Sequence, residues 1–184
     1  MGIDRLDYWI GKKALSADEI DSNRFLKATR QYANTAIQYG RDRYSGKDMP
    51  LFADCIHIEH LKAPRSITSH RTGTEPVPTV WSFFHNQQNL MRLLASLSQF
   101  TGEGKYVNVA GEAAEYMFNN YWYKESGLLH WGGHGYIDLV TGNTYGMKGV
   151  VHEIEDVYPY WELLRSVNPE RGEMLMKGIW EANV

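Results

Sequence analysis

The first clear pattern of apolar and polar positions begins after Ser16. Ser16 and Glu19 have the spacing of a capping box, in which each side chain satisfies a backbone N–H group at the start of a helix. Apolar residues then recur at roughly helical spacing: Ile20, Phe25, Ala28, Tyr32, Ala36 and Tyr39. The pattern predicts an amphipathic helix over about residues 17–44, ended by Gly46 and Pro50.

Prolines and mixed polar residues dominate the next segment, 51–80, which we predict to be mostly extended loop with at most a short strand near 51–58. Helical periodicity returns at Asn86, and Gly102 supplies the stop signal. The apolar face of this helix is formed by Leu90, Leu93, Leu94, Leu97 and Phe100. A second helix, beginning near Lys105, is expected to pack on it through Tyr106, Val109, Ala110, Ala113, Tyr116 and Met117.

The segment after this helical hairpin has a different pattern. Residues 128–131 and 136–140 have the alternation of short strands, and 141–143 have the composition of a turn. Helical periodicity resumes over 153–167, and Asn168 followed by proline predicts the capped start of a final helix. We therefore expect a short β-hairpin or ordered loop inserted near 128–150 among helices.

Antiparallel helix pairs with the unusual residues on their loops predict a mainly α fold. We expect one domain over residues 1–184, arranged as an incomplete (α/α) toroid, with an ordinary helical bundle as the alternative. A full ring of helix pairs needs a much longer chain than 184 residues. The sequence is therefore expected to be the N-terminal part of a larger toroid.

Composition narrows the function classes. The net charge of −3 and the scattered Lys and Arg argue against nucleic-acid binding. Cys55 is the only cysteine, which excludes intrachain disulfides and cysteine-based zinc sites. The sequence has no apolar run of about 18 residues and no signal-peptide pattern, so we expect no membrane span and a cytoplasmic protein as given. An upstream leader would make it periplasmic.

Histidines gather around the predicted hairpin. His130 and His134 flank a Gly-rich turn and His152 precedes Glu153, so imidazoles and a carboxylate converge if the hairpin folds back. Such ligands suit zinc, manganese, iron or nickel. We take His134 and Glu153 as metal ligands, with His152 and His130 contacting substrate. The alternative is a Gly-rich turn with surface histidines.

Further polar and aromatic residues complete the candidate site. Lys148 lies between the hairpin and Glu153 and could transfer a proton as the catalytic residue. The amides of Asn86 and Gln88 could hydrogen-bond sugar hydroxyls or cap a helix. An aromatic ring beside the site, Trp131 or Tyr136, could stack on a pyranose. A second metal site is conceivable at His57, Glu59 and His60.

Together these motifs resemble a known family. The resemblance rests on four segments of the sequence: 85–90, which open a predicted helix, 128–134 in a predicted loop, 152–153, and 158–162. They are similar to pectate lyases of the α/α-toroid type, polysaccharide lyase family 2, over about residues 30–184.

The resemblance implies metal-assisted β-elimination on a uronate polysaccharide such as pectate or an oligogalacturonide. The cation, commonly manganese, would be held by two His and one Glu. His134 resembles the first metal His and Glu153 the metal Glu, whereas Lys148 is a looser match. The family's Arg-His pair is expected further downstream, so weak activity is expected of this chain alone.

Two other function classes stay open. A toroid glycoside hydrolase or sugar epimerase would use carboxylates such as Asp138 and Glu153 as acid and base. A non-catalytic helical module would bind a glycan or a protein partner. The sequence leaves the oligomeric state undetermined.

Overall fold

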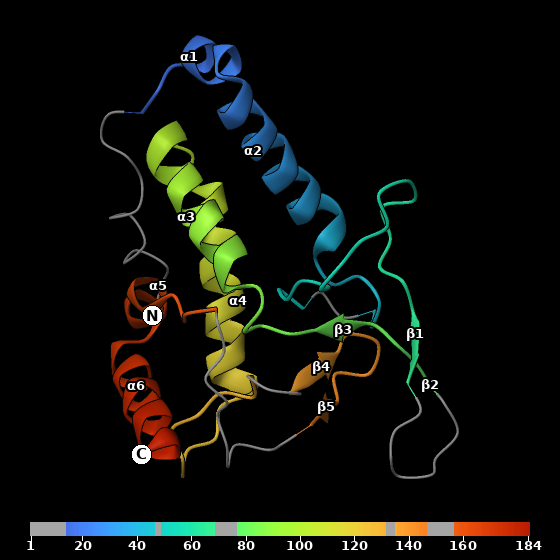
Figure 1. Cartoon of the computed structure of the whole chain (residues 1–184), viewed down its shortest axis with the longest axis vertical. Coiled ribbons are helices and arrows are strands. Elements are labelled where there is room, and N and C mark those ends of the chain that lie inside the picture. Colours follow the sequence, from blue (N-terminus) through green and yellow to red (C-terminus); the bar gives the residue numbers. More distant parts are fainter. Residues whose placement is uncertain (1–13, 47–48, 69–76, 132–134, 147–156) are drawn as a thin grey trace.

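The computed structural model describes residues 14–46, 49–68, 77–131, 135–146 and 157–184 (Figure 1). This part of the chain is mainly helical, as predicted, with two small antiparallel sheets. Its helical elements are α1 (Ala17–Ser22), α2 (Arg24–Thr35), the π-helical turn η2 (Ala36–Gly40), α3 (Gln88–Thr101), α4 (Lys105–Asn120), α5 (Trp161–Val167) and α6 (Pro169–Asn183).

The capping box at Ser16 is confirmed. The Ser16 N–H donates to Glu19 Oε2 at 2.8 Å, and the Glu19 N–H donates to Ser16 Oγ at 3.3 Å. The single helix over 17–44 is wrong, because Asn23 has extended backbone angles and separates α1 from α2. Its side chain accepts hydrogen bonds from two backbone N–H groups at the start of α2. An Asn side chain that bonds the backbone in this way favours a cap over a helix interior.

The buried face of α2 also differs from the predicted one. Phe25 is 69% exposed and Tyr32 is 57% exposed, whereas Ala33, outside the predicted stripe, is fully buried. The break at Asn23 restarts the helix, so the face that meets α3 cannot be extrapolated from Ile20.

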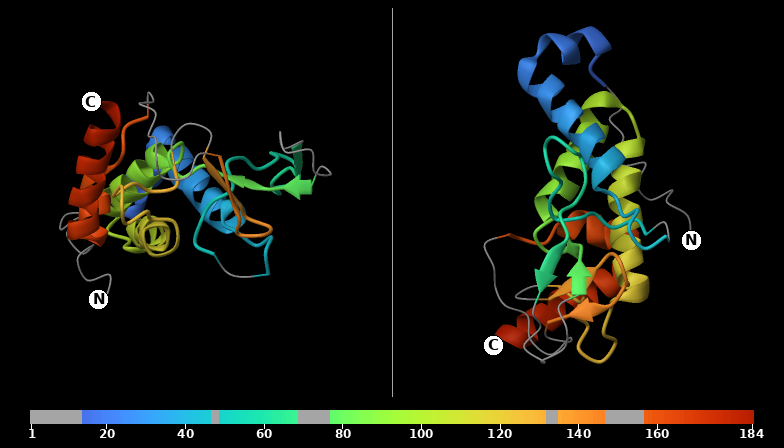
Figure 2. Two further views of the ribbon diagram at one scale, coloured as in Figure 1. Left: turned by 90° about the horizontal axis from the view of Figure 1, so that it is seen from below. Right: turned by 90° about the vertical axis from the view of Figure 1, so that its right-hand side faces the viewer.

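The helical hairpin α3–α4 is confirmed. α3 ends at Gly102, which has a φ of 71° in the left-handed region that glycine adopts readily. The Ser98 hydroxyl fastens the connection, because it donates to Glu103 O at 2.7 Å and accepts from the Val107 N–H at 2.9 Å. The two helices run in opposite directions side by side, and α2 lies against α3 (Figures 1 and 2).

The three-stranded sheet has the order β3 (Trp81–Ser82), β4 (Tyr136–Asp138), β5 (Thr144–Tyr145), all antiparallel. The predicted strand at 136–140 is confirmed in part, since β4 ends at Asp138 and the turn predicted at 141–143 begins at Leu139. Residues 128–131 contribute only an isolated bridge, and β4 instead pairs with the distant β3. Pairing between residues so far apart leaves no local sequence signal.

Residues 51–58 form the predicted extended loop, whose only ladder contact among the described residues is an isolated bridge between Phe52 and Arg41. Two strands appear later in the same loop: β1 (Ser66–Thr68) and β2 (Val77–Thr79). They pair as an antiparallel hairpin that projects from the body of the molecule (Figures 1 and 2).

The final helix begins as predicted, with the Arg171 N–H donating to the cap Asn168 Oδ1 at 3.0 Å. The preceding helix was placed too early, because residues 157–160 are not helical and α5 starts only at Trp161. Pro159 disfavours a helical conformation in Tyr158 just before it.

The helices α5 and α6 pack on each other, and α5 also packs on α4. Such helix pairs are the unit of a toroid, whose closure into a ring stays a prediction. Among the described residues, none of the helices combines the length and apolar character that crossing a bilayer requires.

Candidate functional site

The residues predicted for metal binding and proton transfer lie outside the described part of the chain. These residues are His134, Lys148, His152 and Glu153. Their roles stay predictions. Their nearest described neighbours in the sequence include the ends of β4 and β5, where Tyr136 of β4 is the register partner of Tyr145 of β5.

His130, predicted to contact substrate, is buried and has both ring nitrogens engaged. Its Nε2 lies 2.9 Å from the carbonyl oxygen of Tyr145, and its Nδ1 lies 2.9 Å from the Tyr123 hydroxyl. A carbonyl only accepts, so Nε2 carries the proton and Nδ1 accepts from Tyr123. Burial raises the pKa of Tyr123 further above neutrality, in keeping with a protonated hydroxyl as the donor. His130 thus ties the loop after α4 to β5.

Trp131 lies directly before the first undescribed part of the candidate site and is 3% exposed. Its ring stacks on Phe84 with centroids 5.9 Å apart, and His85 contacts it edge-on at 5.6 Å. These neighbours come from the segment just before α3. The ring is therefore part of the buried packing against the start of α3, and its predicted contact with a sugar stays untested.

Tyr136 has a similar environment. Its ring lies 5.3 Å from Trp81, 5.2 Å from Phe83 and 5.1 Å from Tyr145, measured between centroids. Aromatic side chains of three segments thus cover one another at the end of the sheet. This gives the residues that flank the candidate site a rigid base.

Gln88 and Asn86 differ in their accessibility. Gln88 is buried: its Nε2 donates to Phe84 O at 3.0 Å and its Oε1 accepts from the Tyr160 N–H at 2.8 Å. It therefore joins the start of α3 to the segment before α5. Asn86 is exposed and borders a pocket. Substrate contacts of both residues stay predictions.

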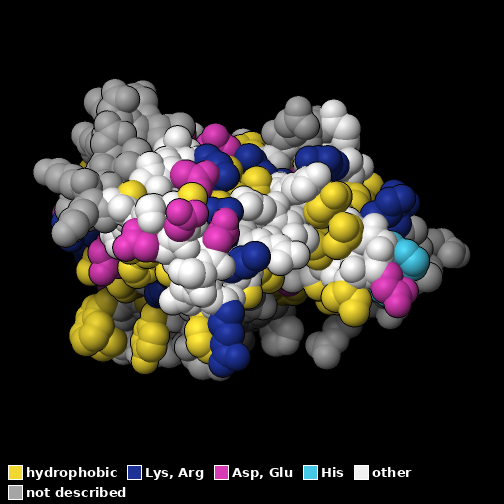
Figure 3. Space-filling view, turned by 90° about the horizontal axis from the view of Figure 1, so that it is seen from above, with side chains coloured by type: hydrophobic (Ala, Val, Ile, Leu, Met, Phe, Trp, Pro, Cys, Tyr) yellow, Lys and Arg dark blue, Asp and Glu magenta, His cyan; other side chains and the backbone are white. Residues whose placement is uncertain are grey.

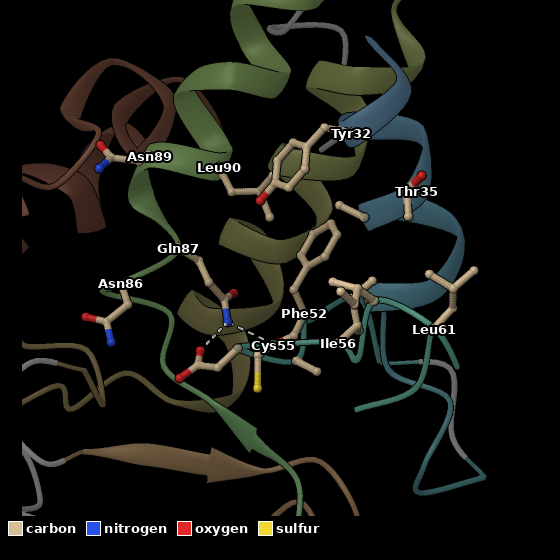
Figure 4. A pocket seen from close by; sticks show the side chains of 15 residues that line it. Tyr32, Thr35, Phe52, Cys55, Ile56, Leu61, Asn86, Gln87, Asn89 and Leu90 are labelled. Atoms are coloured by element: carbon tan, nitrogen blue, oxygen red, sulfur yellow. Dashed lines mark hydrogen bonds between the residues drawn. The ribbon is translucent and has the colours of Figure 1, made fainter. Parts of the chain in front are cut away.

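That pocket has a volume of about 550 Å³ and lies between α2, the segment after Leu51 and the start of α3 (Figure 4). Its polar centre, which the sequence analysis missed, is the pair Asp54 and Gln87. Gln87 Nε2 donates to Phe52 O at 2.8 Å and to Asp54 Oδ1 at 3.1 Å. The run of four amides at 86–89 was the available signal, but nothing in the sequence pointed to Asp54.

The Asp54 carboxylate is crowded by protein atoms on one side, and this loss of hydration raises its pKa. Among the described residues that line the pocket there is no Lys, Arg or His. A polyuronate carries one carboxylate per sugar and is attracted by positive charge or a cation. We therefore keep the end of the sheet around Tyr136 as the candidate site.

Asp138, considered as a hydrolase acid or base, is fully buried. Its Oδ1 accepts from the Val80 N–H at 3.0 Å and the Val140 N–H at 3.1 Å, and its Oδ2 accepts from the Thr141 hydroxyl at 2.7 Å. The carboxylate holds the end of β4 to Val80, which lies between β2 and β3. This arrangement favours a structural role over acid or base catalysis.

Sequence comparisons now decide the family. The family model described as periplasmic pectate lyase matches residues 49–184. A protein of Dickeya dadantii (strain 3937) named pectate disaccharide-lyase is 40% identical over 174 residues, which cover 88% of this chain. The chain belongs to the periplasmic pectate lyase family. It spans 29% of the length of the Dickeya relative.

Membership in the pectate lyase family agrees with the predicted resemblance. The matched range of the family, 49–184, contains the three-stranded sheet, α3 to α6 and every residue proposed for the site. The helices α1 and α2 precede this range. The family similarity therefore falls on the part of the chain that we assign to chemistry.

Proposed function

We propose that this chain carries the substrate- and cation-binding part of a lyase that cleaves pectate by β-elimination. The observation that carries the proposal is the family match over residues 49–184. The Dickeya relative, named for its action on pectate as a disaccharide-lyase, supports the same substrate. An acidic polysaccharide or oligogalacturonide is thus the expected ligand.

Chain geometry supports a common location for two of the proposed residues. In the sequence, His134 comes two residues before Tyr136 and Lys148 three residues after Tyr145. Tyr136 and Tyr145 are direct partners in the sheet. The described sequence neighbours of both proposed residues therefore meet at one end of the sheet, next to the aromatic base.

Each residue has a defined task in this proposal. His134 and Glu153 would hold a divalent cation, since imidazole and carboxylate are ligands that transition metals such as manganese accept. A bound cation supplies positive charge next to the C6 carboxylate and so stabilises the charge that develops when C5 loses its proton. Lys148 would transfer a proton, and His152 would contact the substrate. Loss of the C5 proton and of the glycosidic oxygen from C4 leaves a C4–C5 double bond.

We further propose the toroid architecture for the protein that contains these helix pairs. The antiparallel hairpin α3–α4 and the packing of α5 on both α4 and α6 support it. The family description supports the periplasm as the place of action.

The test uses polygalacturonate, added manganese and near-ultraviolet absorbance, which detects the unsaturated product. We expect slow or no turnover by this chain, and manganese-dependent binding of trigalacturonate in calorimetry. Glu153→Gln and His134→Ala should abolish both signals. Glu115→Gln, on the exposed face of α4, is the matched control and should change neither.

Two results would overturn the proposal. The first is the absence of both unsaturated product and manganese-dependent binding in the unmodified chain. The second is equal signals from the unmodified chain and both site variants. New reducing ends without near-ultraviolet absorbance would instead establish the hydrolase alternative, and chromatography of any unsaturated product would show whether it is a disaccharide.

A further inference from the structure

We propose that the turn at residues 57–60 binds a divalent transition-metal ion through His57, Glu59 and His60. Each of these exposed side chains offers one ligand atom, and the three atoms lie within 4.8 Å of one another. His surface lies beside acidic surface at one edge of the molecule (Figure 3). The other described histidines, His85 and His130, are buried.

The backbone holds this turn closed. The His57 N–H donates to Lys62 O at 2.9 Å, and the Leu61 N–H donates to His57 O at 2.8 Å. Leu61 has a φ of 52°, which reverses the chain direction immediately after the three side chains. Ala63, two residues after Leu61, is anchored to an earlier segment of the chain, because its N–H donates to the Tyr44 hydroxyl at 2.8 Å. The three side chains are therefore presented from a constrained turn, which lowers the entropy cost of bringing them together.

The distances need only a small adjustment. With metal–ligand bonds of about 2.0–2.1 Å at tetrahedral angles, two ligand atoms of one ion are about 3.4 Å apart. The ligand atoms of the cluster lie within 4.8 Å of one another, so they need to approach by up to about 1.4 Å, which side-chain rotation can supply. Exposed side chains make this rotation at little cost.

The two imidazoles are held close together. The Glu59 N–H donates to His57 Nδ1 at 3.2 Å, and this bond within the turn orients the His57 ring. The rings of His57 and His60 stack with centroids 4.6 Å apart and an interplanar angle of 14°. Neutral imidazole is the form that binds metals.

The ligand set selects the class of ion. Two imidazoles with one carboxylate suit zinc, nickel or copper, whereas calcium and magnesium take oxygen ligands. Lys62 lines the same open hollow as the two histidines and weakens the attraction for a cation. Glu59 opposes this effect with its negative charge. The cluster shares no residue with His134 and Glu153, so it is a separate site.

The experiment titrates zinc into the full chain carrying His134→Ala and Glu153→Ala, which removes the proposed catalytic cation site. Calorimetry should show one zinc equivalent and no magnesium binding. Adding His57→Ala and His60→Ala should weaken zinc binding by more than the about 10–100-fold that loss of an outer-shell partner costs. Glu59→Gln should weaken it less, and Lys62→Gln should bind at least as tightly.

Circular dichroism of each variant verifies folding, which these exposed substitutions should leave unchanged. Absence of zinc binding in the His134→Ala, Glu153→Ala background would overturn the proposal. So would unchanged affinity after both turn histidines are replaced, because the zinc would then occupy other residues. Neither result bears on pectate cleavage, which the polygalacturonate assay decides independently.

Discussion

Replacing Asp138 by alanine should destabilise the protein by about 2–4 kcal/mol, although we assign this residue no part in catalysis. Its carboxylate accepts three hydrogen bonds, two of them from the backbone N–H groups of Val80 and Val140. A buried donor left without a partner costs about 1–3 kcal/mol. Val140 is only partly buried, so water can replace part of its lost bond, and the Thr141 hydroxyl can rotate. Two unsatisfied N–H groups together would cost about 2–6 kcal/mol, and the expected loss falls in the lower part of this range.

Urea denaturation followed by far-ultraviolet circular dichroism measures this change in the free energy of unfolding. Asp138→Asn keeps an acceptor oxygen for both N–H groups and should cost only about 1 kcal/mol. Glu115→Ala, at an exposed position of α4, should stay within about 0.5 kcal/mol of the unmodified chain. If Asp138→Ala were no more destabilising than Asp138→Asn, the carboxylate would not be what fastens β4 to Val80.

Three further predictions concern stability and titration. In urea denaturation, Gly127→Ala should lower the free energy of unfolding more than Gly46→Ala does. Both glycines have a φ near 70°, so both substitutions strain the backbone. Only at Gly127 would the added Cβ also clash with a neighbour, the carbonyl oxygen of Met174 at 2.7 Å. Burial raises the pKa of Asp54, so between about pH 4 and the raised pKa the native carboxyl keeps a proton that the unfolded chain has lost. The free energy of unfolding should therefore fall as the pH rises through this range. Asp54→Asn removes the titrating group and should flatten the fall. Burial raises the pKa of Tyr121 to about 12, so Tyr121→Phe should remove one phenol from the most alkaline part of an ultraviolet titration. Three results would contradict these arguments. They are equal losses of stability for the two glycine variants, the same pH dependence of stability in Asp54→Asn as in the unmodified chain, and an unchanged alkaline phase in the ultraviolet titration of Tyr121→Phe.

The helices with complete local signals could be predicted from the sequence. α3 and α4 have long apolar periodicities separated by a glycine stop, and α6 has Asn168 followed by Pro169 at its start. These signals involve residues that are close in the sequence, so they can be recognised without knowing which element the helix packs against. The breaks were harder, because Asn23 fits a helix surface by composition and becomes a cap only when its side chain turns to the backbone.

The sheet could be predicted only where its pairing is local. β4 and β5 are joined by a short turn at 141–143, and the turn composition indicated it. The third strand, β3, lies more than fifty residues earlier and is only two residues long. Its place is fixed by the Asp138 carboxylate and by the rings that cover Tyr136. Neither contact has a signature in the sequence around β3.

The candidate site shows the same division between residue type and role. Sequence reasoning selected His130, Trp131 and Gln88 because imidazoles, rings and amides suit sugar recognition. The structure surrounds each of them with partners from distant segments: Tyr145 for His130, Phe84 for Trp131, and Tyr160 for Gln88. These partners were invisible in the sequence because each lies on a different element.

Those buried contacts also have a consequence for the proposed chemistry. A cation site works only if its ligands are held within a fraction of an ångström, and such precision comes from hydrogen bonds and packing around them. His130 and Trp131 lie four and three residues before His134, and their buried contacts fix the chain just before the proposed ligand. On the far side, the pairing of Tyr136 with Tyr145 fixes the chain just after it. The residues chosen as sugar contacts can therefore anchor the chain next to the proposed ligand His134, whereas cation binding itself would fall to His134 and Glu153.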